Sequence, residues 1–230
     1  MNIYQMNKLE NYFWNCEKNL KVNKWVHYFK VYDRHFSKFI GKNPVILEIG
    51  VAYGGSLEMW NHYFDNNCTI YGVDINPECL EHLPLLQSKN PNTHITIGSQ
   101  EDREFWRTFL KDKPKFDIII DDGGHTMNQQ IITYEELYGN MTDDGVYLCE
   151  DLHTSYWSEY GGGLNKPDTF IEYTKSFIDM LNFYHIRDNL AEEKEKFENF
   201  RKKTNSVHYY DSIIVLEKNL DLSAPEALFR

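Results

Sequence analysis

The chain has 230 residues, a length that fits one globular domain with a small N-terminal addition. Hydrophobic residues make up 41% of it and aromatic residues 15%, which suffices for a large core and excludes an intrinsically disordered chain. The formal net charge is -11, and no dense block of Lys and Arg is present. Because an acidic surface repels phosphate backbones, this composition argues against a nucleic-acid partner.

The sequence also lacks the features of a membrane-spanning or secreted protein. No stretch approaches the roughly 20 apolar residues that cross a bilayer, and the first twenty residues contain no apolar signal core. The cysteines are widely spaced and form no CxxC pair, which is typical of reduced thiols. They are Cys16, Cys68, Cys79 and Cys149. We therefore expect a cytoplasmic protein without a membrane span.

Residues 6–40 are predicted to be helical, because large apolar side chains recur there at three- and four-residue steps. The stripe consists of Trp25, Phe29, Tyr32, Phe36 and Phe39. A Gly-Lys-Asn-Pro sequence at 41–44 ends it. We therefore divide the chain into an N-terminal helical segment, 1–40, and a main domain, 41–230. The aromatic face of the segment is a candidate homodimer surface.

After Pro44, short apolar runs alternate with segments of helical length. The predicted strands are 45–50, 69–75, 94–99, 116–123 and 145–152, and the predicted helices are 54–64, 78–88, 101–112, 126–139, 168–184 and 191–203. Residues 206–218 form either a bulged strand or a tight hairpin. None of the runs alternates cleanly, so both faces of the sheet should be buried. This pattern predicts a doubly wound, Rossmann-like α/β fold.

In such sheets, ligands bind at the carboxyl ends of the strands. Acidic residues end several of the predicted strands: Glu48, Asp74, Asp121, Asp122, Glu150 and Asp151. These side chains are therefore the first candidates for a functional site.

The first strand leads into the glycine-rich sequence EIGVAYGGS at 48–56. Gly50 allows close approach of a ligand, and the following helix presents N–H donors, but the sequence is neither a P-loop nor a regular G-x-G-x-x-G. Asp74 ends the second strand, where a carboxylate can bind both hydroxyls of a ribose. Glu48 would repel a pyrophosphate but suits an ammonium or sulfonium group, so S-adenosylmethionine (SAM) is the expected cofactor. The alternative is an ordinary strand-to-helix turn.

The sequence GSQED at 98–102 follows the third strand. Gln100 and Asp102 are placed where an adenine could be recognised by hydrogen bonds. Asp102 could equally cap the helix that follows.

FDIIIDDGGH and CEDLHTSY end the fourth and fifth strands with a concentration of carboxylates. Asp122, Glu150 and Asp151 are hard oxygen donors, a set that suits Mg²⁺. His125 follows closely and could remove a proton from a hydroxyl group. The alternative is that some of these acids cap helices or pair with buried cations, of which the sequence offers few nearby.

Together the motifs EIGVAYGGS, VDINP, GSQED, IDDGGH and CEDLHTSY resemble the class I SAM-dependent methyltransferases. More narrowly, they are similar to the metal-dependent sugar O-methyltransferases of the macrolide type, from Lys24 to the terminal HYYDSIIVLEK. The resemblance implies a seven-stranded sheet with the last strand antiparallel. It also implies transfer of a methyl group from SAM to a sugar hydroxyl, with Mg²⁺, or Mn²⁺ in its place, as metal.

The resemblance implies roles for individual residues. His125 would be the general base, and Asp122, Glu150 and Asp151 would hold the metal. The cofactor would be bound by Glu48, Gly50, Tyr53, Ser56, Asp74, Ile75, Ser99, Gln100, Asp102 and Asp121.

Related domains occur beside glycosyltransferases, which implies a glycan, glycoconjugate or nucleotide-sugar acceptor in polysaccharide biosynthesis and association with a glycosyltransferase. Two other functions stay open: methylation of a non-sugar small molecule such as a catechol, and a non-catalytic SAM-binding module that scaffolds glycan assembly. A nicotinamide-dependent oxidoreductase is a weaker third interpretation.

Overall fold

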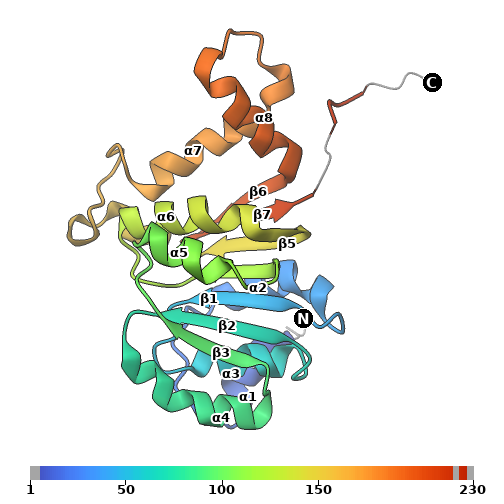
Figure 1. The fold of residues 1–230 in the computed structure, drawn as a ribbon, viewed down its shortest axis with the longest axis vertical. Coiled ribbons are helices and arrows are strands. Elements are labelled where there is room, and N and C mark those ends of the chain that lie inside the picture. Colours follow the sequence, from blue (N-terminus) through green and yellow to red (C-terminus); the bar gives the residue numbers. More distant parts are fainter. Residues whose placement is uncertain (1–5, 220–222, 227–230) are drawn as a thin grey trace, which may run out of the picture.

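The computed structural model describes residues 6–219 and 223–226, and it contains one seven-stranded sheet (Figure 1). The strand order is β3-β2-β1-β4-β5-β7-β6; β1 to β5 run parallel, and β7 is antiparallel to both of its neighbours. The strands are β1 Val45–Ile49, β2 Thr69–Asp74, β3 Thr93–Ile97, β4 Phe116–Asp121, β5 Met141–Cys149, β6 Thr204–Tyr210 and β7 Ile213–Lys218. This topology confirms the predicted class I methyltransferase sheet.

Helices cover both faces of the sheet (Figure 1). They are α1 Lys8–Asn15, α2 Tyr28–Phe36, α3 Gly55–Tyr63, α4 Leu83–Lys89, α5 Arg103–Leu110, α6 Met127–Leu137, α7 Phe170–Leu181 and α8 Lys194–Lys203. Side chains from α1 to α4 belong to one core cluster, and side chains from α5 to α8 belong to the other. The described helices include none with the length and apolarity needed to cross a bilayer.

The absence of alternation in the strands follows from this double cover. In β4, Ile118 and Ile120 point into the first cluster, while Ile119 between them points into the second. All three are fully buried. Since both faces of the strand are apolar, no period of two is visible in the sequence.

The N-terminal segment differs from the prediction. Instead of a continuous helix over 6–40, α1 and α2 are separated by residues 16–27, which contain no regular helix. Part of the reason is that Glu58 on α3 accepts hydrogen bonds from the backbone N–H groups of Asn19 and Leu20. The buried stripe accordingly starts at Phe29, whereas Trp25 is 57% exposed. The expected residues 1–5 of the segment lie outside the described part of the chain.

Two further elements differ in detail. The predicted helix at 78–88 divides into a 3-10 turn at Pro77–His82 and then α4, which carries Pro84 in its first turn, where the missing N–H costs nothing. At the C-terminus, the hairpin alternative is correct, because β6 and β7 pair around Asp211 and Ser212, and Ser212 has a φ of 64°.

Candidate active site

The turn after β1 brings the backbone of two strands into contact. Gly50 has a φ of 91°, and a Cβ at this position would collide with the backbone carbonyl of Asp122 at the end of β4. The Gly50 N–H donates to the carbonyl of Val73 on β2. Only glycine combines this conformation with so close an approach, so the glycine predicted from the sequence sets the floor of the site.

Asp74 holds the same turn from the end of β2. Its Oδ2 accepts from the backbone N–H groups of Val51 and Ala52, both at 2.8 Å, and its Oδ1 accepts from that of Asn76, also at 2.8 Å. The carboxylate thus fixes the loop that a cofactor would touch, in addition to facing a cavity itself.

Gln100 and Asp121 form a second support beneath the site. Gln100 Nε2 donates to Asp121 Oδ1 at 2.6 Å, and Gln100 Oε1 accepts from the Gly124 N–H at 2.9 Å. Burial raises the pKa of Asp121 to about 7. Asp102 lies apart from this pair and caps α5, accepting from the N–H groups of Glu104 and Phe105, so the structure contains the capping arrangement that the sequence left open.

Two adjoining cavities follow the strand ends, with volumes of about 530 and 210 Å³. They share four lining residues and therefore adjoin, and together they are here called the cleft; the shared residues are Gly50, Ala52, Asp122 and Gly123. The predicted site residues that line the larger cavity are Gly50, Tyr53, Ser56, Asp122, His125, Glu150 and Asp151. Those in the smaller cavity are Gly50, Asp74, Ile75, Gln100 and Asp122. Glu48, Ser99, Asp102 and Asp121 line neither of the two.

The part of the carboxylate cluster that faces the cleft, here called the open half, consists of Asp122, His125 and Asp151. His125 Nε2 lies 3.5 Å from Asp151 Oδ2 and 3.9 Å from Asp122 Oδ1, and one ligand atom from each residue lies within 4.8 Å of the others. About one fifth of each side chain is exposed. His125 and Asp151 both have positive φ values, 59° and 55°, which is uncommon outside glycine and is typical of functional turns.

Behind it lies the buried half, which consists of Lys24, Glu48 and Glu150. Lys24 Nζ donates to both carboxylate oxygens of Glu150, at 3.0 and 3.1 Å, and lies 3.5 Å from Glu48 Oε1. It also donates to Asp122 Oδ2 at 2.5 Å, so Asp122 joins the two halves. The three side chains of the buried half are at most 2% exposed. Two acids of the predicted metal site, Asp122 and Glu150, therefore pair with the buried cation Lys24. This is the alternative to metal binding that the sequence analysis left open.

Charge is unevenly balanced in the buried half. Burial alone would lower the pKa of Lys24, but the carboxylates of Asp122, Glu150 and Glu48 outweigh it, and the ammonium stays protonated. One cation does not neutralise three carboxylates. Burial raises the pKa of Glu48 to about 7. Burial also raises the pKa of Glu150 well above its ordinary value, and the charge of neighbouring Asp122 contributes to this rise.

Sequence reasoning missed three residues of the N-terminal segment. The predicted site did not include Lys24 or Tyr28, and Tyr32 was expected in the apolar stripe. In the structure, Tyr28 donates to Asp151 Oδ1 at 2.7 Å and Tyr32 donates to Glu150 Oε1 at 2.6 Å. The available signal was a Lys directly before the aromatic residues of this segment, in a chain with several strand-end acids.

Comparisons with known proteins agree with this fold. Residues 47–152 match a family model described as a methyltransferase domain. A tetracenomycin-pathway rhamnosyl 3'-O-methyltransferase of Streptomyces olivaceus is 31% identical over 208 residues, which are 86% of this chain and 50% of that protein. Mycinamicin VI 2''-O-methyltransferase of Micromonospora griseorubida is 31% identical over 173 residues, 70% of this chain and 41% of that protein.

A solved structure of the mycinamicin-pathway methyltransferase MycE, in complex with Mg, S-adenosylhomocysteine (SAH) and mycinamycin VI, matches 93% of this chain and 54% of its own. The TM-score is 0.75 at 26% identity. This chain spans about half the length of the curated relatives that it matches. The sheet order and these matches together show that the chain has the class I methyltransferase fold and is similar to sugar O-methyltransferases.

Proposed function

We propose that this protein transfers a methyl group from SAM to a hydroxyl of a sugar carried by a larger acceptor, with Mg²⁺ as metal. The observation that carries the proposal is the open half of the carboxylate cluster. Asp122, His125 and Asp151 converge on the wall of a cleft whose floor is the Gly50 turn.

The smaller cavity suits the adenosine end of SAM. Asp74 and Gln100 line it, together with the exposed side chain of Ile75, and they supply polar groups beside an apolar surface. Glu48 and Asp121 contribute from behind the wall, since Glu48 contacts Lys24 and Asp121 accepts from Gln100. The larger cavity is then left for the methionine end and the acceptor, with Tyr53 and Ser56 on its wall.

The residues of the open half fit a magnesium ion. Asp122 and Asp151 supply two carboxylates there, and Mg²⁺ binds through one or two carboxylates together with water and substrate oxygens, so His125 is not needed as a ligand. When bound, the ion would supply positive charge that lowers the pKa of the acceptor hydroxyl. Glu150 directs both of its oxygens to Lys24, so its proposed contribution here is to fix Lys24, while direct ligation by Glu150 stays a prediction.

His125 is the proposed general base. Its Nε2 faces the carboxylates of the open half, whereas its Nδ1 is buried and has no hydrogen-bond partner among the described residues. Thr154 Oγ1 donates to the His125 backbone carbonyl at 3.0 Å, which holds the turn. The hydroxyl proton passes to Nε2 as the oxygen bonds to the methyl carbon and the sulfur–carbon bond breaks, so the products are the methyl ether and SAH. Asp151, 3.5 Å away, stabilises the resulting imidazolium.

The acceptor is proposed from the relatives, whose names specify rhamnosyl and olivosyl sugars on tetracenomycin and oleandolide. Sugars attached to a polyketide or a similar small molecule are therefore the first acceptors to test. The polysaccharide acceptor expected from the sequence, the homodimer and the association with a glycosyltransferase have no support in the comparisons.

The test is methyl transfer from labelled SAM to a panel of glycosylated polyketides, nucleotide sugars, oligosaccharides and catechols. We expect transfer to a sugar-bearing acceptor that is abolished by EDTA, restored by Mg²⁺, and reduced by about 10²- to 10⁴-fold in His125→Ala. His94→Ala, at an exposed position on β3, is the matched control. Activity that persists both with EDTA and in His125→Ala would overturn the mechanism. SAM binding without transfer to any acceptor would favour the non-catalytic module.

A further inference from the structure

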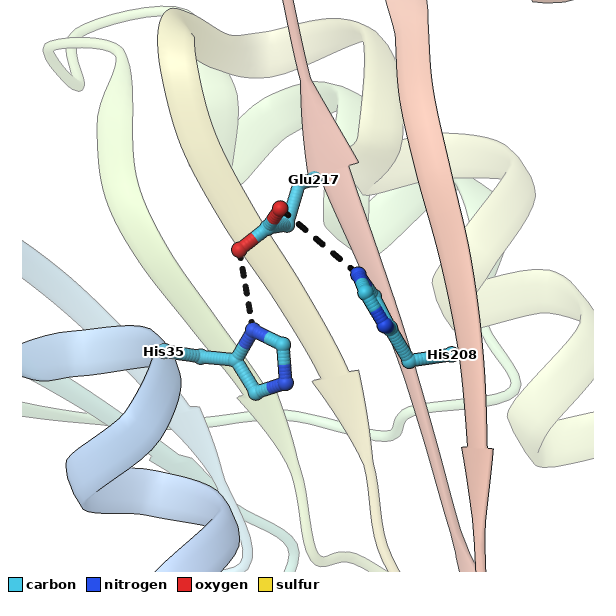
Figure 2. Close-up of side chains that lie close together, drawn as sticks. All are labelled: His35, His208 and Glu217. Carbon is cyan, nitrogen blue, oxygen red and sulfur yellow. Dashed lines mark hydrogen bonds and ion pairs between the residues drawn. The ribbon is translucent and has the colours of Figure 1, made fainter.

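A second polar cluster lies where helix α2 meets the C-terminal hairpin. His35 comes from the last turn of α2, His208 from β6 and Glu217 from β7, and all three side chains point toward one another (Figure 2). None of the three lines the cleft. The cluster is therefore separate from the proposed active site and has no part in the proposed reaction.

The distances within this cluster are short. His35 Nδ1 lies 2.9 Å from Glu217 Oε1, and His208 Nε2 lies 3.6 Å from Glu217 Oε2. One ligand atom from each residue lies within 4.8 Å of the other two, and the two imidazole rings are 4.8 Å apart between centroids. Ligand atoms around a tetrahedral ion with metal–ligand bonds of about 2.0–2.1 Å are roughly 3.3 Å apart, so small side-chain movements would bring all three to one ion.

We propose that His35, His208 and Glu217 form a binding site for a divalent transition-metal ion, with Zn²⁺ as the best fit. Two imidazoles and one carboxylate are a ligand set that zinc accepts readily and that magnesium does not prefer. This donor set differs from the open half of the carboxylate cluster, where two carboxylates favour a hard cation. The chain would therefore hold two different ions at two sites.

One surrounding side chain orients a ligand in the way that metal sites require. Tyr210 OH lies 2.8 Å from His35 Nε2, the ring nitrogen that faces away from Glu217. With Nε2–H donating to this hydroxyl, Nδ1 would carry its lone pair toward the ion. Ser206 Oγ lies 3.0 Å from Glu217 Oε2 and 2.9 Å from His208 Nε2, the two atoms that would bind the ion, so a bound ion would replace these two contacts.

Access to the site is one-sided. The His35 side chain is 2% exposed, whereas those of His208 and Glu217 are 31% and 25% exposed. An ion could enter from the hairpin side, where water would complete its coordination. Helix α2 also carries Tyr28 and Tyr32, which donate hydrogen bonds to Asp151 and Glu150. A bound ion would link α2 to the hairpin and so stabilise the helix that supports the carboxylate cluster.

The experiment is a Zn²⁺ titration of the full chain in excess Mg²⁺, with a chromophoric chelator as competitor. We expect one zinc per chain outside the Mg²⁺ site, bound at least tenfold more weakly by His208→Gln and by Glu217→Gln. Asp151→Asn, in the open half, should leave this affinity unchanged, and His94→Gln is the matched histidine control. Saturating Zn²⁺ should raise the Tm of the unsubstituted chain by about 5 °C and should leave that of His208→Gln unchanged.

A second measurement does not depend on substitution. Co²⁺ bound to the unsubstituted chain should give the intense visible bands of a four-coordinate site, which zinc abolishes. Three outcomes would overturn the proposal: no stoichiometric zinc binding, zinc affinity that is unchanged in His208→Gln and Glu217→Gln, or zinc affinity that is lost in Asp151→Asn. A weak six-coordinate cobalt spectrum would count against it equally.

Discussion

The two halves of the carboxylate cluster both contain carboxylates from neighbouring strand ends, but the negative charge is compensated differently in each half. In the buried half, Lys24 lies among carboxylates that are at most 1% exposed, and the protein supplies the compensating cation itself. In the open half, Asp122 Oδ1 and Asp151 Oδ2 face a partly exposed histidine. Among the described residues, Lys24 pairs with Asp122 through Oδ2, and Asp151 has ion-pair contacts with histidines but with no Lys or Arg.

This difference separates residues that hold the fold from the residues that we propose to hold a metal ion. A buried ammonium is costly to move once it is paired, since separation leaves uncompensated charges in a medium of low polarity. In the proposed function, the carboxylates of the open half bind a cation from solution. Asp122 contacts both halves, because its Oδ2 accepts a hydrogen bond from Lys24 and its Oδ1 faces His125. Asp122 therefore links the stability of the buried half to the proposed chemistry of the open half.

Removing the cation of the buried half should have the largest effect. Lys24→Met removes the ammonium shared by Asp122, Glu150 and Glu48, and we expect a loss of about 3–5 kcal/mol in the free energy of unfolding at pH 7. Urea denaturation measures it. Lys21→Met, at an exposed position nearby, should change stability by less than about 0.5 kcal/mol. Equal effects of the two substitutions would remove the distinction between the halves.

The buried half should also make stability depend on pH. The pKa of Glu48 is raised by burial from 4.5 to about 7, so between these values the folded state binds more protons than the unfolded state. Glu48 therefore lowers the free energy of unfolding by about 2–3 kcal/mol as pH rises from about 4.5 to about 7. Glu48→Gln should flatten this dependence in denaturation curves measured across that range. An unchanged pH profile would contradict it.

In the open half, the expected effect is on metal affinity. Asp151→Asn removes one charged ligand, and we expect at least tenfold weaker Mg²⁺ activation, about 1.4 kcal/mol of binding free energy. Glu150→Gln should change Mg²⁺ activation less and thermal stability more, because Glu150 faces Lys24. Mg²⁺ titrations of methyl transfer, together with melting curves, measure both quantities. The reverse order would identify Glu150 as the stronger ligand.

The smallest effect concerns a helix-capping carboxylate that belongs to neither half. Asp102 caps α5, so Asp102→Ala should cost about 1 kcal/mol of stability, and Asp102→Asn should restore most of it. The affinity for SAM, measured by calorimetry, should be the same in all three proteins. Weaker SAM binding by Asp102→Asn would instead support the role in adenine recognition.

The sequence alone determined the sheet and the row of strand-end acids. Short runs of Val and Ile, bounded by glycines and polar residues, define the parallel strands through local propensity and burial. The carboxyl ends of parallel strands must meet at one edge, which brought Asp122 and Asp151 to a single cleft. Close backbone approach likewise required Gly50. These features depend on neighbours in the chain and on the general geometry of α/β sheets.

Only the tertiary structure decided how the acids divide between two roles. Lys24 meets Asp122 and Glu150 across sequence separations of 98 and 126 residues, and no local pattern specifies such a pairing. Residues 16–27 follow an irregular path in part because Glu58 binds the backbone of Asn19 and Leu20, across 39 and 38 residues of sequence. The periodicity of a sequence indicates which face of a helix or strand is apolar. It does not indicate which buried charges pair, because the pairing depends on how separate elements pack together.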